Sequence, residues 1–174
     1  MAKKVQYLVI HCTATPEGRP VTSGDIRRWH TSPPPAGRGW KQVGYTDMVH
    51  LDGTIERLVP NNDDDIVDTW EITNGVAGIN SVSRHIVYVG GISRGVSNTP
   101  SNTPKDTRTP SQKAALGNYV LEFVRRHPHV QVAGHYQFDR SKPCPSFDVP
   151  KWCRQIGVPE KNTAYFVHST SIRT

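Results

Sequence analysis

The sequence predicts a single α/β (α+β) domain in which helices flank a central mixed β-sheet. A length of 174 residues suits one domain, since typical domains contain roughly 100 to 150 residues. Short apolar runs typical of strands are interspersed with segments that carry helix-capping signals, and no internal repeat occurs. Such an order builds one sheet with helices packed on it. We expect the domain to span residues 1–156, with a C-terminal tail over residues 157–174.

Hydropathy and charge narrow the class of protein. The mean hydropathy of -0.55 indicates a well-hydrated chain, and no apolar run approaches the roughly 20 residues of a membrane span. A net charge of +6 favours an anionic partner such as nucleic acid, a membrane surface or bacterial wall polymers. Because the basic residues are scattered, we expect no specific nucleic-acid binding. Three cysteines argue against a disulfide scaffold and leave room for a metal ligand or a reactive thiol.

The first strand is expected near the N-terminus. Residues 5–10 alternate as a strand does and deliver His11 at its C-terminal end, where ligands often bind in α/β sheets. Alternation places Cys12 on the opposite face, which favours a buried small thiol over a second metal ligand. The apolar stretch is short and is interrupted by Gln6, so the segment does not read as a signal peptide.

A short helix and an irregular loop come next. Thr22 or Ser23 can cap a helix that runs through Trp29. The following residues 31–39 are rich in proline and glycine, which excludes regular structure there.

Residues 43–58 are expected to form a β-hairpin. Its turn is placed at Asp52-Gly53, because this pair readily supplies the positive φ angles of a tight two-residue connection. The polar, Asn/Asp-rich residues 59–83 read as a long surface excursion that shapes one wall of a cleft.

An interior strand is predicted over residues 85–89, and Gly90-Gly91 ends it. The Ser-, Asn-, Thr- and Pro-rich residues 93–105 are expected to form a mobile loop.

The next helix has the clearest boundaries in the chain. Thr109 can cap it with Gln112 three residues on, Pro110 occupies the first turn and Pro128 stops it. Its expected buried stripe consists of Leu116, Tyr119, Val120, Phe123 and Val124. Residues 130–133 then form a short strand that leads to His135. A last short helix opens at residues 148–152, and Gly157 closes it.

Two histidines and one cysteine form a candidate zinc site. His11 and His135 each end a predicted strand, and Cys144 lies on a loop stiffened by Pro143 and Pro145. A catalytic zinc site uses three such nitrogen and sulfur ligands and keeps a fourth position for water. The spacing of these residues is equally compatible with histidines that are hydrogen-bonded in the core or exposed at the surface.

Four local sequences occur together and in order: residues 9–15, 40–45, 52–54 and 142–148. This set resembles the type 2 N-acetylmuramoyl-L-alanine amidases, the family of bacteriophage T7 lysozyme and the peptidoglycan recognition proteins. The resemblance covers about residues 4–156.

The resemblance implies a zinc cleft at the strand ends, with Zn²⁺ as cofactor. The metal ligands match His11, His135 and Cys144, and the catalytic tyrosine and lysine match Tyr45 and Lys142. The implied reaction hydrolyses the amide that joins N-acetylmuramic acid to L-alanine in bacterial peptidoglycan.

Several positions concern substrate binding or depart from the family pattern. Trp40 could line the sugar or peptide site, and Asn80 fits the family pattern for a substrate role. His85 could reach the cleft, although a hydrogen-bonded structural histidine is the alternative. Relatives commonly carry histidine where this chain has Thr46, and some place one at about the position of Gly75. Strand alternation places Thr46 on the face opposite Tyr45, so we expect the threonine to alter packing rather than catalysis. The remaining histidines are expected at surface or structural positions: His30, His50, His127, His129 and His168.

Two other functions compete with a zinc amidase. A non-catalytic peptidoglycan-binding module typically lacks the cysteine ligand, whereas Cys144 and Lys142 are both present here. A thiol hydrolase pairing Cys144 with His135 would need a free thiolate and no metal. A wall-degrading enzyme without a signal peptide must be released by lysis, by a membrane pore or by another export route. We therefore expect a monomeric phage or mobile-element lysin.

Overall fold

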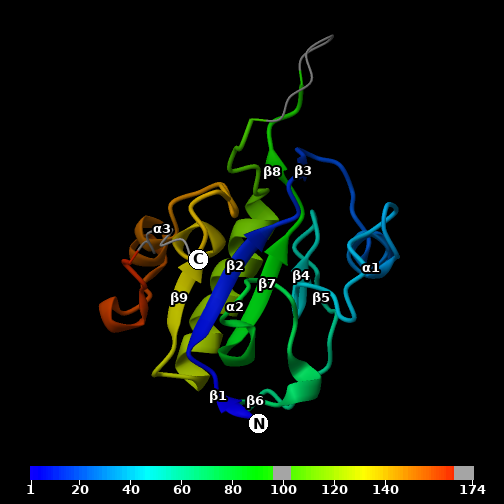
Figure 1. Cartoon of the computed structure of the whole chain (residues 1–174). Coiled ribbons are helices and arrows are strands. Elements are labelled where there is room, and N and C mark those ends of the chain that lie inside the picture. The colour runs from blue at the N-terminus through cyan, green and yellow to red at the C-terminus, as the bar shows by residue number, and fades with distance from the viewer. Residues whose placement is uncertain (96–102, 167–174) are drawn as a thin grey trace.

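The computed structural model describes residues 1–95 and 103–166 (Figure 1). The strands are β1 (Lys3–Lys4), β2 (Tyr7–Cys12), β3 (Thr15–Pro16), β4 (Asp47–Val49), β5 (Ile55–Arg57), β6 (Ile66–Val67), β7 (Ser83–Tyr88), β8 (Gly91–Ile92) and β9 (Gln131–Gly134). The α-helices are α1 (Ser23–Thr31), α2 (Pro110–Arg126) and α3 (Val149–Ile156). The 3-10 helices are η1 (Thr69–Glu71), η2 (Asn80–Val82), η3 (His135–Gln137) and η4 (Glu160–Asn162). Within these described ranges, no helix has the length and apolar character that crossing a membrane requires.

The central sheet has five strands in the order β5-β4-β7-β2-β9. Strands β4, β7, β2 and β9 run parallel to one another, and β5 pairs antiparallel with β4 at the edge. Figure 1 shows β2 and β7 at the middle of this sheet. The arrangement confirms the predicted mixed sheet in a single α/β (α+β) domain. Because β2 and β9 are parallel neighbours, their C-terminal ends meet at one edge.

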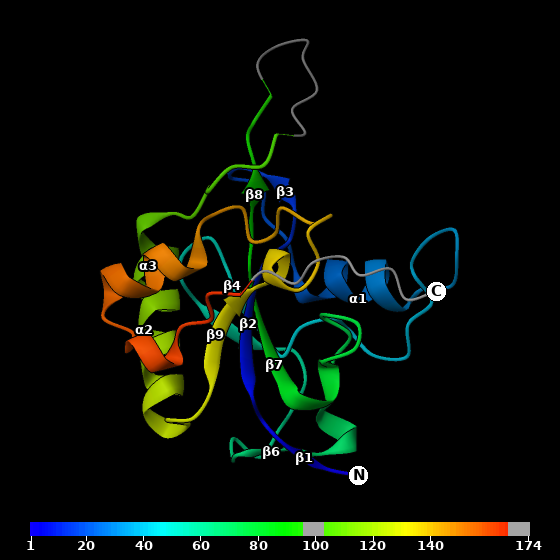
Figure 2. The same ribbon diagram turned by 60° about the vertical axis from the view of Figure 1, so that its left-hand side comes forward.

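Helices cover both faces of the sheet, as Figure 2 shows with α2 and α3 on one side and α1 on the other. Leu8, Ile10 and Cys12 of β2 pack in the core formed with α2 and α3. The opposite face carries a second core that includes Ile26 of α1 and Val87 of β7. Strand alternation therefore turns His11 away from the larger core and toward the α1 side.

The predicted boundaries of α2 are confirmed by its capping hydrogen bonds. The Thr109 hydroxyl accepts the N–H group of Gln112 at 3.0 Å, and the Gln112 side chain accepts the N–H group of Thr109 at 3.0 Å. The buried Gln112 amide also donates to the carbonyl groups of Val49 and Val89. These bonds tie the start of α2 to the ends of β4 and β7. In α3, Asp148 caps the first turn and Gly157 ends the helix with φ 89°, also as predicted.

The turn of the β4–β5 hairpin differs from the predicted two-residue connection. The N–H group of His50 donates to the Thr54 carbonyl at 2.8 Å, so the connection consists of residues 51–53. Gly53 adopts a positive φ of 87°, whereas the Asp52 carboxylate accepts the N–H group of Thr54 at 2.9 Å. A three-residue loop with glycine at the left-handed position is the next most common hairpin connection.

The polar excursion over residues 59–83 is anchored more firmly than its composition indicates. Its strand β6 pairs antiparallel with β1 and forms a separate two-stranded sheet with it at the N-terminus. Glu71 is buried and accepts the N–H groups of Asn62 at 2.7 Å and Asp68 at 3.1 Å. Its carboxylate also lies 3.4 Å from the Arg84 guanidinium. These contacts hold the excursion against β7.

Two predicted irregular segments are partly described. Of the loop expected to be mobile, residues 96–102 lie outside the described residues, and Ser93 before them donates its N–H group to the Thr103 carbonyl at 2.9 Å. In the predicted tail, residues 167–174 lie outside the described residues. Earlier in that tail, Ala164 is buried and donates its N–H group to the Val132 carbonyl at 3.0 Å. This part of the tail therefore packs beside β9.

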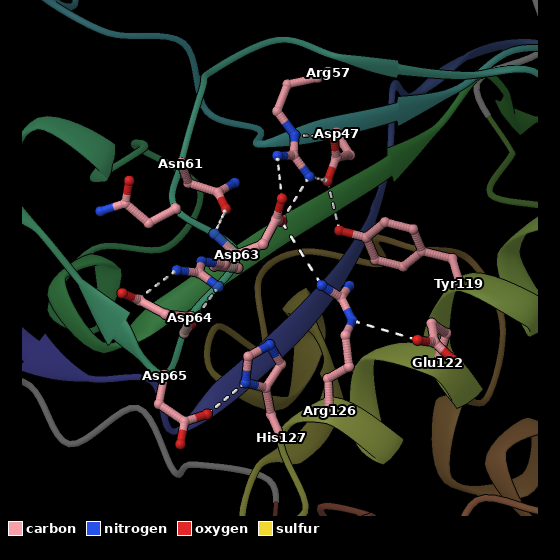
Figure 3. Close-up of polar contacts among 12 residues, drawn as sticks. Asp47, Arg57, Asn61, Asp63, Asp64, Asp65, Tyr119, Glu122, Arg126 and His127 are labelled. Atoms are coloured by element: carbon pink, nitrogen blue, oxygen red, sulfur yellow. Dashed lines mark hydrogen bonds and ion pairs between the residues drawn. The ribbon is translucent and has the colours of Figure 1, made fainter.

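A buried carboxylate links β4, β5 and α2 (Figure 3). The Asp47 side chain is only 3% exposed and accepts hydrogen bonds from Arg57 Nε at 2.9 Å and from the Tyr119 hydroxyl at 2.6 Å. Arg57 also pairs with Asp63 at 3.0 Å. Each polar group of Asp47 is thereby compensated, as a buried charge requires.

Replacing Asp47 by alanine should lower the free energy of unfolding by about 3 kcal/mol, because breaking a buried ion pair leaves its partners uncompensated. We expect the lower end of the usual range, since Arg57 is 37% exposed and keeps Asp63. Tyr119→Phe is the matched control and should cost only about 1 kcal/mol, the value of one hydrogen bond. Urea unfolding with an unchanged m-value measures both. Equal losses in the two variants would contradict the proposed importance of the carboxylate.

Candidate metal centre and active site

Strand pairing brings two histidines together at one edge of the sheet. The parallel register of β2 and β9 places Ile10 beside Gly134. His11 and His135 follow these two residues directly, and their ring centroids are 4.8 Å apart. The close approach of the two rings is thus a consequence of parallel pairing between the first and last strands of the sheet.

The loop after η3 brings Cys144 to the same edge. Tyr136 donates its N–H group to the Cys144 carbonyl at 2.9 Å, and the Tyr88 hydroxyl donates to the Pro145 carbonyl at 2.7 Å. The N–H group of Cys12 donates to the Cys144 sulfur at 3.2 Å. This sulfur lies 3.7 Å from His11 Nδ1. Backbone N–H groups of β2 and η3 and the Tyr88 hydroxyl of β7 therefore fix the position of the thiol.

His11, His135 and Cys144 form a cluster whose ligand atoms all lie within 4.8 Å of one another. Burial lowers the pKa values of His11 and His135, which keeps both imidazoles neutral and their lone pairs free for a metal. Burial raises the pKa of the Cys144 thiol, and the hydrogen bond from the Cys12 backbone opposes this effect. Two imidazoles and one sulfur are the donor set that a catalytic zinc ion uses. The residues present fit zinc.

Cys12 is adjacent to this cluster and to the cleft, but its side chain packs in the hydrophobic core. Its side chain is 4% exposed and packs in the core with Ile10. Its sulfur lies 3.8 Å from the Ser146 hydroxyl. This placement agrees with the alternation of side chains along β2, which predicted a buried small thiol.

The cluster lies in a cleft of about 760 Å³. Other predicted site residues line the same cleft: Trp40, Tyr45, Asn80 and Lys142. The lining also includes Asn74 and Gly75, so the polar excursion contributes to the cleft as predicted.

Tyr45 and Lys142 are both placed beside the candidate metal ligands. The Tyr45 ring centroid lies 5.2 Å from that of His11. Burial raises the pKa of Tyr45, so its hydroxyl keeps its proton near neutral pH and can donate a hydrogen bond. Lys142 is exposed at the cleft, two residues before Cys144. Thr46 is buried and its hydroxyl accepts the N–H group of His85 at 3.3 Å, consistent with the expected packing role.

The three predicted substrate-binding residues have different surroundings. The Trp40 ring centroid lies 5.2 Å from the Arg38 guanidinium carbon and 4.9 Å from the His30 ring centroid. Asn80 accepts the N–H group of Val76 at 2.8 Å and thereby shapes the cleft wall. His85 does not fit the predicted role, because its side chain is 0% exposed and does not line the cleft. Its Nδ1 atom lies 2.9 Å from His11 Nε2, which agrees with the hydrogen-bonded alternative.

Further residues of the cleft were not singled out from the sequence. His30, expected at a surface or structural position, lines the cleft and accepts the N–H group of Gly44 at 3.0 Å. Burial lowers its pKa to about 4. Arg38 and Lys41 add positive charge to the lining. The sequence signal that could have identified them is their position on either side of Trp40, a predicted substrate-binding residue.

Comparison with known sequences gives matches along most of the chain. The profile of the N-acetylmuramoyl-L-alanine amidase family matches residues 1–147. The endolysin of Enterobacteria phage K11 is 32% identical over 153 residues, which cover 87% of each chain. The endolysin of Escherichia phage T7 is 27% identical over 146 residues, which cover 83% of each chain.

Solved structures share the fold. The N-acetylmuramoyl-L-alanine amidase LysC from Clostridium intestinale superimposes with a TM-score of 0.65 at 20% identity, covering 90% of this chain and 87% of that chain. The chain therefore shares the fold of this solved structure. The chain belongs to the N-acetylmuramoyl-L-alanine amidase family.

Proposed function

We propose that this protein is a zinc-dependent amidase that hydrolyses the bond between N-acetylmuramic acid and L-alanine in bacterial peptidoglycan. The observation that carries the proposal is the cluster of His11, His135 and Cys144, which shares one cleft with Tyr45 and Lys142. Membership of the amidase family and the similarity to phage endolysins support the same activity.

In this proposal the three ligands hold zinc and two further side chains act on the reacting amide. Bound zinc supplies Lewis-acid chemistry that activates water and polarises the carbonyl group. The protonated Tyr45 hydroxyl orients the attacking water or donates to the carbonyl oxygen. The Lys142 ammonium stabilises the negative charge that develops on this oxygen. Trp40 and Asn80 contact the sugar or the stem peptide from the walls of the cleft.

The alternatives are less well supported by the site. A non-catalytic peptidoglycan-binding module needs neither Cys144 nor Lys142, yet both lie in the cleft. A thiol hydrolase needs a thiolate nucleophile, whereas burial raises the pKa of Cys144. The same thiol becomes a good ligand once a metal displaces its proton.

The biological role we propose is that of a monomeric endolysin of a phage or mobile element, acting on the cell wall after release. The similarity to phage endolysins supports this role. The net charge of +6 favours association with anionic wall polymers.

Removal of the metal tests the proposed chemistry. Incubation with a strong chelator should abolish hydrolysis of peptidoglycan, and added zinc should restore it, because the ligands remain in place. Zinc content is measured alongside activity at each step. Full activity in protein shown to be free of metal would support the thiol mechanism and contradict ours.

A further inference from the structure

A second buried imidazole lies directly behind the candidate metal ligand His11. His85 is on β7, the neighbour of β2, and its side chain is 0% exposed. Its Nδ1 atom is 2.9 Å from His11 Nε2. The other ring nitrogen of His85, Nε2, is buried and has no hydrogen-bond partner among the described residues. The imidazole of His85 therefore makes a single hydrogen bond among the described residues, and that bond joins it to His11.

The geometry sets the direction of this hydrogen bond once a metal binds. Nδ1 of His11 faces the Cys144 sulfur at 3.7 Å, so it is the nitrogen available to the metal. A neutral imidazole that ligates through Nδ1 carries its proton on Nε2. His11 then donates this proton to the hydrogen bond, and His85 Nδ1 accepts it.

We propose that His85 is a positioning residue that holds His11 in the tautomer and orientation with Nδ1 toward the metal. A metal-ligating histidine usually donates its second N–H group to a carboxylate, a backbone carbonyl or water. Here another imidazole takes that place. The inference rests on the zinc site of the proposed function.

A neutral acceptor suits this location. The His85 ring is fully buried, and a neutral imidazole is less costly to bury there than a charged group. A carboxylate at the same place would put a net negative charge where the side chain is 0% exposed, and burying such a charge is costly.

Gly75 makes room for the His85 ring. A Cβ atom at position 75 would lie 2.3 Å from His85 Nδ1 and 2.5 Å from its Cγ. The flanking backbone is fixed, because Asn74 donates its N–H group to the Val43 carbonyl and Val76 donates to Asn80. A side chain at position 75 would therefore displace the imidazole rather than the backbone.

Two substitutions at position 85 distinguish a role as hydrogen-bond acceptor from a role in packing alone. His85→Leu fills similar space without an acceptor, whereas His85→Asn offers its Oδ1 atom near the place of Nδ1. Zinc affinity is measured by competition with a chromophoric chelator, on variants whose folding is checked by circular dichroism. We expect about 10- to 100-fold weaker zinc binding in His85→Leu, the usual effect of losing such a partner. His85→Asn should stay within a few-fold of the unmodified protein.

A measurement without substitutions completes the test. NMR of the zinc-loaded protein with isotope-labelled histidine nitrogens should show His11 protonated at Nε2 and metal-bound at Nδ1. The inference is overturned if Nε2 of His11 is the metal-bound nitrogen, if folded His85→Leu binds zinc normally, or if both variants lose zinc equally. Absence of zinc binding in the unmodified protein would instead overturn the proposed function, and with it this inference.

Discussion

Cys144→Ser should remove most of the bound zinc and most of the amidase activity. The thiolate is the only sulfur in the three-residue cluster, and a serine hydroxyl is a poor substitute for it as a zinc ligand. Metal analysis of the purified protein should give about one zinc per chain before the substitution and a clear deficit after it. Turnover of peptidoglycan is measured on the same samples.

Cys12→Ala is the matched control for this substitution. Cys12 is adjacent to His11 but its side chain packs in the core. The variant should therefore keep its zinc and lose only a modest amount of stability from reduced packing. Full zinc content and full turnover in Cys144→Ser would show that the ligand assignment is wrong. A loss of zinc in folded Cys12→Ala would contradict the assignment of its side chain to the core.

Lys142→Met should lower kcat by roughly 10² to 10³, the effect of removing one preorganised donor to a developing negative charge. The substitution removes the charge and retains much of the length of the side chain. Because the interaction is made mainly in the transition state, kcat and kcat/KM should fall together. Zinc content should not change, since Lys142 is not part of the ligand cluster.

Tyr45→Phe is the companion variant, because it removes only the hydroxyl from the other side chain proposed to act on the amide. It too should fold and hold zinc. A Lys142→Met enzyme with normal kcat and a raised KM would indicate that the lysine only binds an anionic part of the substrate. The catalytic role of Lys142 would then be withdrawn.

The sequence predicted those parts of the fold that have strong local signals. Thr109 and Gln112 form the expected capping box, and Gly157 ends α3 in the left-handed conformation. The pairing of β1 with β6 and of β3 with β8 was not predicted, because strands of two residues carry no periodic pattern. The hairpin turn was assigned the wrong length, since Asp52-Gly53 suits both a two-residue and a three-residue connection.

For the site, the family motifs and the strand ends indicated the residues that the structure brings into one cleft. The contact between His85 and His11 could not be predicted from the motifs or the strand ends. His85 shares a sheet face with His11 only because β7 and β2 are parallel neighbours in a particular register. The local sequence predicts neither which strand pairs with β2 nor the register of that pairing. The space that Gly75 leaves for the His85 ring likewise depends on a tertiary contact, because Gly75 lies in the polar excursion and His85 lies in β7.

The central claim is most directly tested by digestion of purified peptidoglycan and chemical analysis of the ends produced. A muramoyl-alanine amidase should release free L-alanine amino termini without new reducing sugar ends. Chelator-treated protein and the Cys144→Ser variant serve as controls and should release neither. New reducing ends without free L-alanine termini would identify a glycosidase and contradict the proposed function.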